Sequence, residues 1–280
     1  MMPTPNMMDT ILVLTDFSDT AFHAALYACF ISRQLDSKRI VLFHVFQTII
    51  NSEIPPNPDQ IQILYESSKT DLKKMREKLL GLVPPGVTID YKIVSDAYLG
   101  SINKYTEEEK ADLVVMGTSS KTKFEKVLIG SNAISVADNS QKPVLIIPPH
   151  AEIKPIVHAV IACDLQKVAE TMPVKELKAI LDDLLVSVSV VNIDHDNNNF
   201  KPDTPLDMTF LHESLEEYDP AYNFIDNPDV VAGIIDFAIA DKASIIIMLP
   251  KNYNFFKELF HHSATHEIVY DAPIPILVLR

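Results

Sequence analysis

One segment of the chain reads Leu113-Val114-Val115-Met116-Gly117-Thr118-Ser119-Ser120, and the triplet Gly130-Ser131-Asn132 follows it. The apolar run predicts a buried strand, and Asn132 to Asp138 has the character of a helix. A glycine directly after a strand lets the backbone turn sharply and approach a ligand closely. The first N–H groups of a helix are unpaired and lie at the positive end of its dipole. The segment therefore predicts a phosphate-binding loop between a strand and a helix.

Apolar runs and helical spacings alternate along the rest of the first half. We expect strands at 10–15, 39–46, 87–94, 112–116 and 143–147, and helices at 59–80, 98–109 and 132–138. Ser18 is placed to cap a further helix, whose apolar face would be Phe22, Leu26, Phe30 and Ile31.

After a proline-containing linker at 148–155, the same order of elements returns. We expect strands at 156–162, 186–191, 220–225, 244–248 and 275–279, helices at 171–185, 207–217, 227–241 and 262–270, and a surface loop at 192–205. Alternating strands and helices predict a parallel sheet with right-handed crossovers. Because the strands are almost continuously apolar, we expect helices on both faces of the sheet.

The second half of the chain repeats the first. A shift of 132 positions aligns Lys110 with Lys242, Met116 with Met248, and Pro143 with Pro275 without a gap. This shift aligns 38 positions, of which seven are identical, and the apolar positions also match. Together with the repeated order of elements, this favours a duplication. A chain of 280 residues also suits about two domains, which we place at 1–149 and 150–280.

The chain resembles the universal stress protein family, in its tandem two-domain form, in three stretches. These are Ile11-Leu12-Val13-Leu14-Thr15-Asp16-Phe17-Ser18, Leu42-Phe43-His44-Val45, and the loop from Gly117 to Ser131. Nucleotide-binding members of that family show Gly, two residues, Gly, nine residues, then Gly-Ser or Gly-Thr. This spacing is present here, with Ser120 in place of the second glycine. The resemblance implies two tandem α/β domains, each an open five-stranded parallel sheet that is Rossmann-like and similar to adenine-nucleotide alpha hydrolases.

The resemblance also implies a site for ATP, with Mg²⁺, at the carboxyl ends of the strands in the first domain. In the family's pattern Asp16 lies by the adenosine, Val45 offers its backbone to the adenine, and Met116 and Gly117 line the site. Gly130, Ser131 and Asn132 hold the phosphates. The hydroxyl of Ser120 would donate to a phosphate, or its Cβ would crowd one. The last strands, 143–147 and 275–279, are expected to pair across the two domains.

The second copy of the loop lacks the residues that hold phosphate. Asp164 corresponds to Asp16, but Gln166 replaces Ser18, Leu249 replaces Gly117, Asn252 replaces Ser120 and His262 replaces Gly130. Leucine does not readily adopt the turn, and a histidine side chain would fill the phosphate pocket. We predict that the second domain does not bind ATP in the family's manner.

Catalytic residues cannot be assigned from the sequence. A Walker lysine does not follow the glycine loop, and neither a base nor Mg²⁺ ligands for phosphoryl transfer can be named. We therefore predict a binding protein rather than an enzyme, with at most a slow ATPase activity. His262 and His266 are spaced i and i+4 on an expected helix, but neither a cysteine nor a second pair supports a metal. We interpret them as solvated or capping residues and predict no metal site.

The composition restricts the partners and the compartment. The chain has 38 acidic and 24 basic residues, a formal net charge of −14, which argues against nucleic acid as a partner. The apolar runs fall short of the ~18 residues needed to span a bilayer, and residues 1–8 do not resemble a signal peptide. We expect a cytoplasmic protein without membrane contact. Cys29 and Cys163 form no disulfide framework.

Three functions stay open at the level of sequence. The first is a stress-response or regulatory protein that binds ATP or a related adenine nucleotide in the first domain and presents a changed surface to a partner. The second is a ligand-free interaction or scaffold protein in which both sites have decayed. The third is a protein that binds a small molecule or a metal in the cavity of the second domain. Whether the chain forms a homodimer also stays open.

Overall fold

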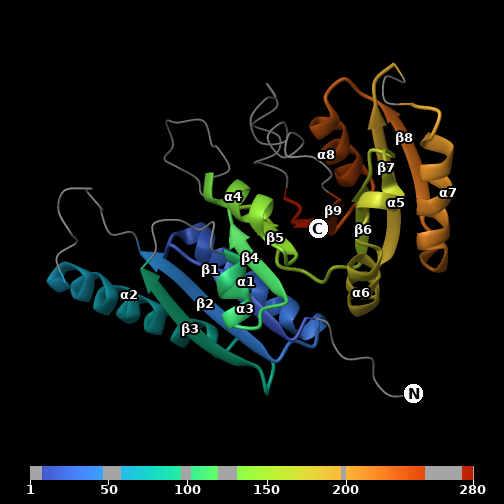
Figure 1. Ribbon diagram of the computed structural model, residues 1–280. Coiled ribbons are helices and arrows are strands. Elements are labelled where there is room, and N and C mark those ends of the chain that lie inside the picture. Colours follow the sequence, from blue (N-terminus) through green and yellow to red (C-terminus); the bar gives the residue numbers. More distant parts are fainter. Residues whose placement is uncertain are drawn as a thin grey trace, which may run out of the picture.

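The computed structural model describes residues 8–46, 58–95, 102–118, 131–196, 200–249 and 273–279. Within this part, ten strands form a single sheet (Figure 1). The strands are β1 Thr10–Leu14, β2 Arg39–Phe46, β3 Thr88–Ser95, β4 Leu113–Gly117, β5 Val144–Ile147, β6 His158–Ala162, β7 Ser187–Asp194, β8 Ala221–Asp226, β9 Ile245–Met248 and β10 Ile276–Val278. The helices are α1 Asp19–Gln34, α2 Pro58–Leu79, α3 Ile102–Glu108, α4 Ser131–Asn139, α5 Val168–Thr171, α6 Val174–Leu184, α7 Thr204–Leu215 and α8 Val230–Ala240, and a 3₁₀ turn covers Glu216–Tyr218.

The sheet has the strand order β3-β2-β1-β4-β5-β10-β9-β6-β7-β8. Neighbouring strands are parallel within each half, and β5 and β10 pair antiparallel at the centre, with Leu145 opposite Leu277. The predicted fold class and the predicted pairing of the last strands are therefore confirmed. The first half contributes β1 to β5 and the second half β6 to β10, side by side in one sheet (Figure 1).

The two halves also share their strand register. Val114 of β4 pairs with Val144 of β5, and Ile246 of β9 pairs with Ile276 of β10. Both pairs are related by the shift of 132 positions that aligns the two halves of the sequence. Identical register means that equivalent positions reach equivalent places at the sheet edge. Residues of the two halves can therefore be compared one to one.

Two apolar cores cover the two faces of the sheet. Helices α1, α2, α5, α6 and α7 pack on one face, and α3, α4 and α8 pack on the other. Each core contains residues from both halves, among them Leu145 and Leu277 on the first face and Ile146 and Ile276 on the second. The apolar packing is therefore continuous across the β5–β10 junction.

The buried face of α1 differs from the prediction. The helix buries Ala21, Ala24, Ala25 and Ala28 against the sheet, while Phe30 is 38% exposed. Of the predicted face, Ile31 is buried and Phe22 and Leu26 pack partly buried against the core, so the prediction is wrong only for Phe30. The small alanine side chains allow the helix to approach the sheet closely. The predicted cap is confirmed, since Ser18 Oγ accepts a hydrogen bond from the Ala21 N–H at 3.2 Å.

Strand β7 is longer than predicted. It ends at Asp194 instead of residue 191, because its last residues pair with β8 through Asp194 and Asp226. Ladder hydrogen bonds join main-chain groups and so tolerate polar side chains. Helix α5 was not expected. The predicted helix at 262–270 lies outside the described residues.

Both cysteines are buried and unlinked. Burial raises the pKa of the Cys29 thiol to about 12, so this side chain behaves as a small apolar core residue. Across the described residues, none of the helices combines the length and the apolarity that a membrane span requires.

Candidate functional site

The turn between β1 and α1 places Asp16 at the carboxyl edge of the sheet. The Ser18 N–H donates to Asp16 Oδ1 at 3.0 Å, and Phe17 adopts a left-handed backbone conformation with φ of 66°. Short polar side chains stabilise such turns by binding the main chain two residues on. The carboxylate of Asp16 is exposed at this edge.

The end of β2 lies against the same turn. A ring nitrogen of His44, Nδ1, is 2.8 Å from the Thr15 carbonyl oxygen, and the rings of His44 and Phe17 lie 4.4 Å apart. His44 is thus a structural residue. The pairing of β2 with β1 ends at Phe43, whereas its pairing with β3 continues to Phe46. The main chain around Val45 therefore extends past the end of β1, beside the turn that carries Asp16.

Gly117 ends β4, and the reason for a glycine there differs from the one we predicted. Its φ lies outside the left-handed region, so the turn itself does not require glycine. A Cβ at this position would lie 2.5 Å from the carbonyl oxygen of Thr20, in the first turn of α1. Glycine is needed because β4 and α1 approach each other so closely. Met116, the preceding residue, is buried.

Thr118 follows β4 and carries a buried polar atom. Its hydroxyl oxygen has no hydrogen-bond partner within the described part of the chain, although its N–H donates to the Ile147 carbonyl at 3.2 Å. A buried hydroxyl without a partner costs roughly 1–3 kcal/mol. We had not singled out this residue as a ligand contact, since a threonine after a strand has no distinctive sequence signal.

These residues meet at one place in the first half. Strand β1 lies between β2 and β4, so Asp16, Val45 and Gly117 belong to three adjacent strand ends at the same edge. Helix α4 joins the parallel neighbours β4 and β5, so its first residues, Ser131 and Asn132, also start at this edge. Ser120 and Gly130 lie outside the described residues.

The equivalent turn in the second half has the same geometry. The Gln166 N–H donates to Asp164 Oδ1 at 3.1 Å, and Leu165 has a φ of 54°. Asn192 replaces His44 and donates from Nδ2 to the Cys163 carbonyl at 2.9 Å. A pocket of about 410 Å³ opens here, lined in part by Asp164 and Asn192. The sequence had raised such a cavity as one alternative, and His262, which we named with it, lies outside the described residues.

Acidic residues and one histidine gather at the ends of β7 and β8. His195 Nδ1 lies 2.8 Å from Asp226 Oδ1, and His195 Nε2 lies 3.4 Å from Asp196 Oδ2. The hydrogen bond between His195 and Asp226 raises the pKa of His195 and lowers the pKa of Asp226. We had expected residues 194–196 in a mobile loop, but Asp194 ends β7 and His195 contacts β8. All three side chains of the cluster are exposed, and it does not define a metal site by itself.

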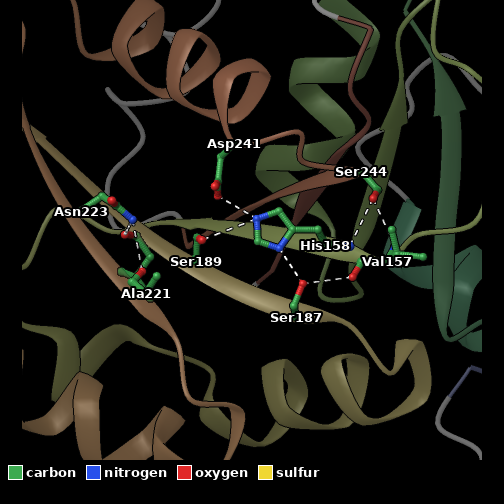
Figure 2. A network of polar contacts seen from close by, with 9 residues as sticks. Val157, His158, Ser187, Ser189, Ala221, Asn223, Asp241 and Ser244 are labelled. Atoms are coloured by element: carbon green, nitrogen blue, oxygen red, sulfur yellow. Dashed lines mark hydrogen bonds and ion pairs between the residues drawn. The ribbon is translucent and has the colours of Figure 1, made fainter.

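A histidine with acidic and hydroxyl neighbours lies at the opposite edge of the sheet (Figure 2). His158 Nε2 is 2.7 Å from Asp241 Oδ2, and His158 Nδ1 is 2.8 Å from Ser187 Oγ. Burial alone would raise the pKa of Asp241, but hydrogen bonds with His158 and Ser189 lower it overall. We had found no such constellation in the sequence, because its members belong to β6, β7 and the end of α8.

This network resembles a catalytic triad in composition but not in its surroundings. The N–H groups of Val157 and His158 both donate to Ser244 Oγ, at 3.1 and 3.2 Å, and the Ser187 N–H donates to the Val157 carbonyl. These main-chain donors are therefore not available to an oxyanion. We interpret the network as a structural clamp that joins β6, β7 and α8.

Comparisons with known proteins agree with this fold. The profile of the universal stress protein family matches residues 7–148, so the chain belongs to that family. Universal stress protein MJ0531 of Methanocaldococcus jannaschii is 30% identical over 144 residues, which cover 51% of this chain and 83% of that protein. MJ0577 of the same organism is 27% identical over 158 residues, 50% of this chain and 95% of that protein.

Several solved structures span both halves. A universal stress protein from Archaeoglobus fulgidus superposes over 98% of this chain and 97% of its own, with a TM-score of 0.72 and 16% identity. The likeness at this identity concerns the fold. It shows that the overall fold, across both halves, occurs in another universal stress protein.

Proposed function

We propose that this universal stress protein binds ATP or a related adenine nucleotide in its first half and acts in a stress response without efficient catalysis. The supporting observation is that Asp16 and Gly117 lie at the carboxyl ends of the neighbouring strands β1 and β4. The chain runs from β1 to β2 and β3 on one side, and then returns to β4 and β5 on the other. Ligands of open parallel sheets bind at this switch point, beyond the carboxyl ends of the strands.

The groups at the switch point suit an adenine nucleotide. The exposed carboxylate of Asp16 can accept hydrogen bonds from ribose hydroxyls. The extended end of β2 around Val45 offers main-chain groups to a base. The Thr118 hydroxyl supplies a buried donor, and the first turn of α4 suits phosphate. Bound ATP would bring Mg²⁺, which would neutralise part of the phosphate charge.

Isothermal titration of Mg²⁺-ATP into the purified chain tests the proposal, after nucleotide carried through purification has been removed. We expect one nucleotide per chain. Asp16→Asn should weaken binding by about tenfold or more, because it removes a charged hydrogen-bond acceptor. The amide oxygen can still accept the Ser18 N–H, so the turn should persist. The matched change in the second half, Asp164→Asn, tells which half holds the nucleotide.

Several outcomes would contradict parts of the proposal. Two nucleotides per chain, or a loss of binding in Asp164→Asn instead of Asp16→Asn, would place nucleotide in the second half. No binding at all would favour the interaction-protein alternative. Phosphate release at many turnovers per minute would contradict the absence of efficient catalysis. Gly130→Val provides a second variant, expected to abolish binding by filling the predicted phosphate loop.

A further inference from the structure

The pocket in the second half has the size of a site for a small organic molecule. It lies beyond the carboxyl ends of β6, β7 and β8 and against α7, and its volume is about 410 Å³. An adjoining hollow of about 240 Å³ shares Leu165, Asn192, Met208 and Phe224 with it. Small-molecule sites typically measure roughly 300–1,000 Å³. A bare metal ion would leave most of this space unfilled.

Three carboxylates line the pocket, one from the end of each strand. Asp164 follows β6, Asp194 ends β7 and Asp226 ends β8. Asp194 and Asp226 are direct partners in the strand register, an arrangement in which like charges repel. The described residues that line the pocket include no lysine or arginine. The half-exposed imidazole of His195, bonded to Asp226, offsets part of this negative charge.

The first half lacks most of this negative charge at the equivalent positions. In the strand register, the positions equivalent to Asp194 and Asp226 are Phe46 and Ser95, which are likewise paired at the ends of β2 and β3. Of the three carboxylates that line the second pocket, only Asp164 has an acidic counterpart in the first half, Asp16. The second half therefore has three carboxylates where the first half has one. A triphosphate would be repelled by this lining, and a cation would be attracted.

Most of the other described lining residues are apolar. Phe200 and Phe224 line the pocket, yet they are 59% and 57% exposed. Met208 of α7 lies on the same wall. Exposed aromatic side chains at a pocket indicate a contact surface, and the face of an aromatic ring attracts a cation. Carboxylates beside exposed rings are the combination that recognises an organic cation.

We infer that this pocket binds a small organic cation, an amine or guanidinium group carried on an apolar or aromatic body. The charged group would lie among Asp164, Asp194 and Asp226, and the apolar body would lie against Phe224 and Met208. This site is separate from the proposed nucleotide site, since every described residue that lines it belongs to the second half. Either proposal can therefore fail without the other.

A fluorescence titration with tryptamine tests the inference. The chain contains no tryptophan, so the emission and anisotropy of the indole report the ligand selectively. Two analogues of the same size separate charge from shape: neutral indole-3-ethanol and anionic indole-3-acetate. We expect one tryptamine per chain, with the anion at least about tenfold weaker, since each factor of ten corresponds to about 1.4 kcal/mol.

Substitutions of residues that line the pocket provide the second test of the inference. Asp194→Asn and Asp226→Asn should each weaken tryptamine about tenfold, and Phe224→Leu should weaken it severalfold by removing the ring. Asp219→Asn is the matched control, because Asp219 is exposed and precedes β8 at the opposite edge of the sheet. Its φ of 45° also suits asparagine. This control should bind tryptamine like the unaltered chain.

Four results would overturn the inference. The first is equal binding of tryptamine and indole-3-acetate, and the second is tryptamine binding that does not change in the two aspartate variants. The third is displacement of tryptamine by ATP in a chain that carries Gly130→Val, which would make the pocket a nucleotide site. The fourth is no tryptamine binding in a chain that binds Mn²⁺ through Asp226, which would make it a metal site.

Discussion

Gly117 lies at a close approach between β4 and α1, at the edge of the sheet that carries the proposed nucleotide site. The end of β4 and the first turn of α1 touch there, and the carbonyl of Thr20 occupies the place that a Cβ would take. Because this carbonyl belongs to the backbone of a capped helix, it cannot rotate away as a flexible side chain could. The same close approach brings Asp16, at the start of the turn before α1, near the end of β4. The packing and the proposed nucleotide site thus share the same small residue.

The first prediction concerns this contact. Gly117→Ala should lower the free energy of unfolding by about 1–3 kcal/mol, the range for overpacking in a tight site. The matched variant is Gly81→Ala, because no heavy atom lies within 4 Å of the Cβ position and its φ is not left-handed. That change should stay within about 1 kcal/mol of the unaltered chain. Urea unfolding followed by circular dichroism measures both, and equal losses would contradict the steric explanation.

At the scale of elements, the clamp around His158 explains how α8 is held on the sheet. The helix ends at Ala240, and Asp241, the residue after it, contacts a histidine that begins β6, which in turn contacts Ser187 at the start of β7. One side chain therefore joins three elements that are far apart in the chain. Its stabilising effect depends on the charge of Asp241.

The second prediction follows from the pKa of Asp241, which is lowered from its usual value of 3.8. A carboxyl group with a lowered pKa stabilises the fold above its unfolded pKa, and this contribution is lost as the pH falls through the folded pKa. Asp241→Asn should therefore cost about 1 kcal/mol at pH 7, and the difference from the unaltered chain should begin to shrink below about pH 4 and disappear once the pH lies below the folded pKa. Urea unfolding across this pH range measures it. Asp236→Asn, an exposed position on the same helix, is the control; the same pH-dependent loss there would contradict a role for the clamp.

At the scale of the whole molecule, the two halves are joined by more than the β5–β10 pairing. Both cores cross this junction. Gln34 at the end of α1 donates to the Leu184 carbonyl at 2.9 Å and accepts the Ile156 N–H at 3.0 Å, so the first half is hydrogen-bonded to the second. Such shared packing should make the halves unfold together.

The third prediction tests this cooperation. Leu277 is 3% exposed and faces Leu145 in the strand register. Leu277→Ala should destabilise the chain by about 2–5 kcal/mol, as expected for a large-to-small change in a core, and the unfolding curve should keep one transition at a lower midpoint. Leu206→Ala, at a leucine that is 70% exposed, is the control and should have little effect. Two separated transitions in the unaltered chain would show that the halves fold independently.

Much of this architecture was determined by the sequence alone. The apolar run Arg39–Phe46 matches β2 at both ends, and Ser18 caps α1 as predicted. Such features depend on local periodicity and on nearest neighbours in the chain, so they can be read without coordinates. The role of Asp16 came instead from the resemblance to the universal stress protein family, whose pattern places this residue by the adenosine.

Only the tertiary structure decided which distant side chains meet. It brought Asp194 beside Asp226 across two strands, placed both with Asp164 in one pocket, and joined His158 to Asp241 at the other edge. It also assigned Gly117 to a helix contact instead of a turn. Strand register and the distance between packed elements set these neighbours, and neither depends on the spacing of residues along the chain. The family and its fold could therefore be recognised from the residues, while the negative charge of the second pocket became visible only once the strands were paired.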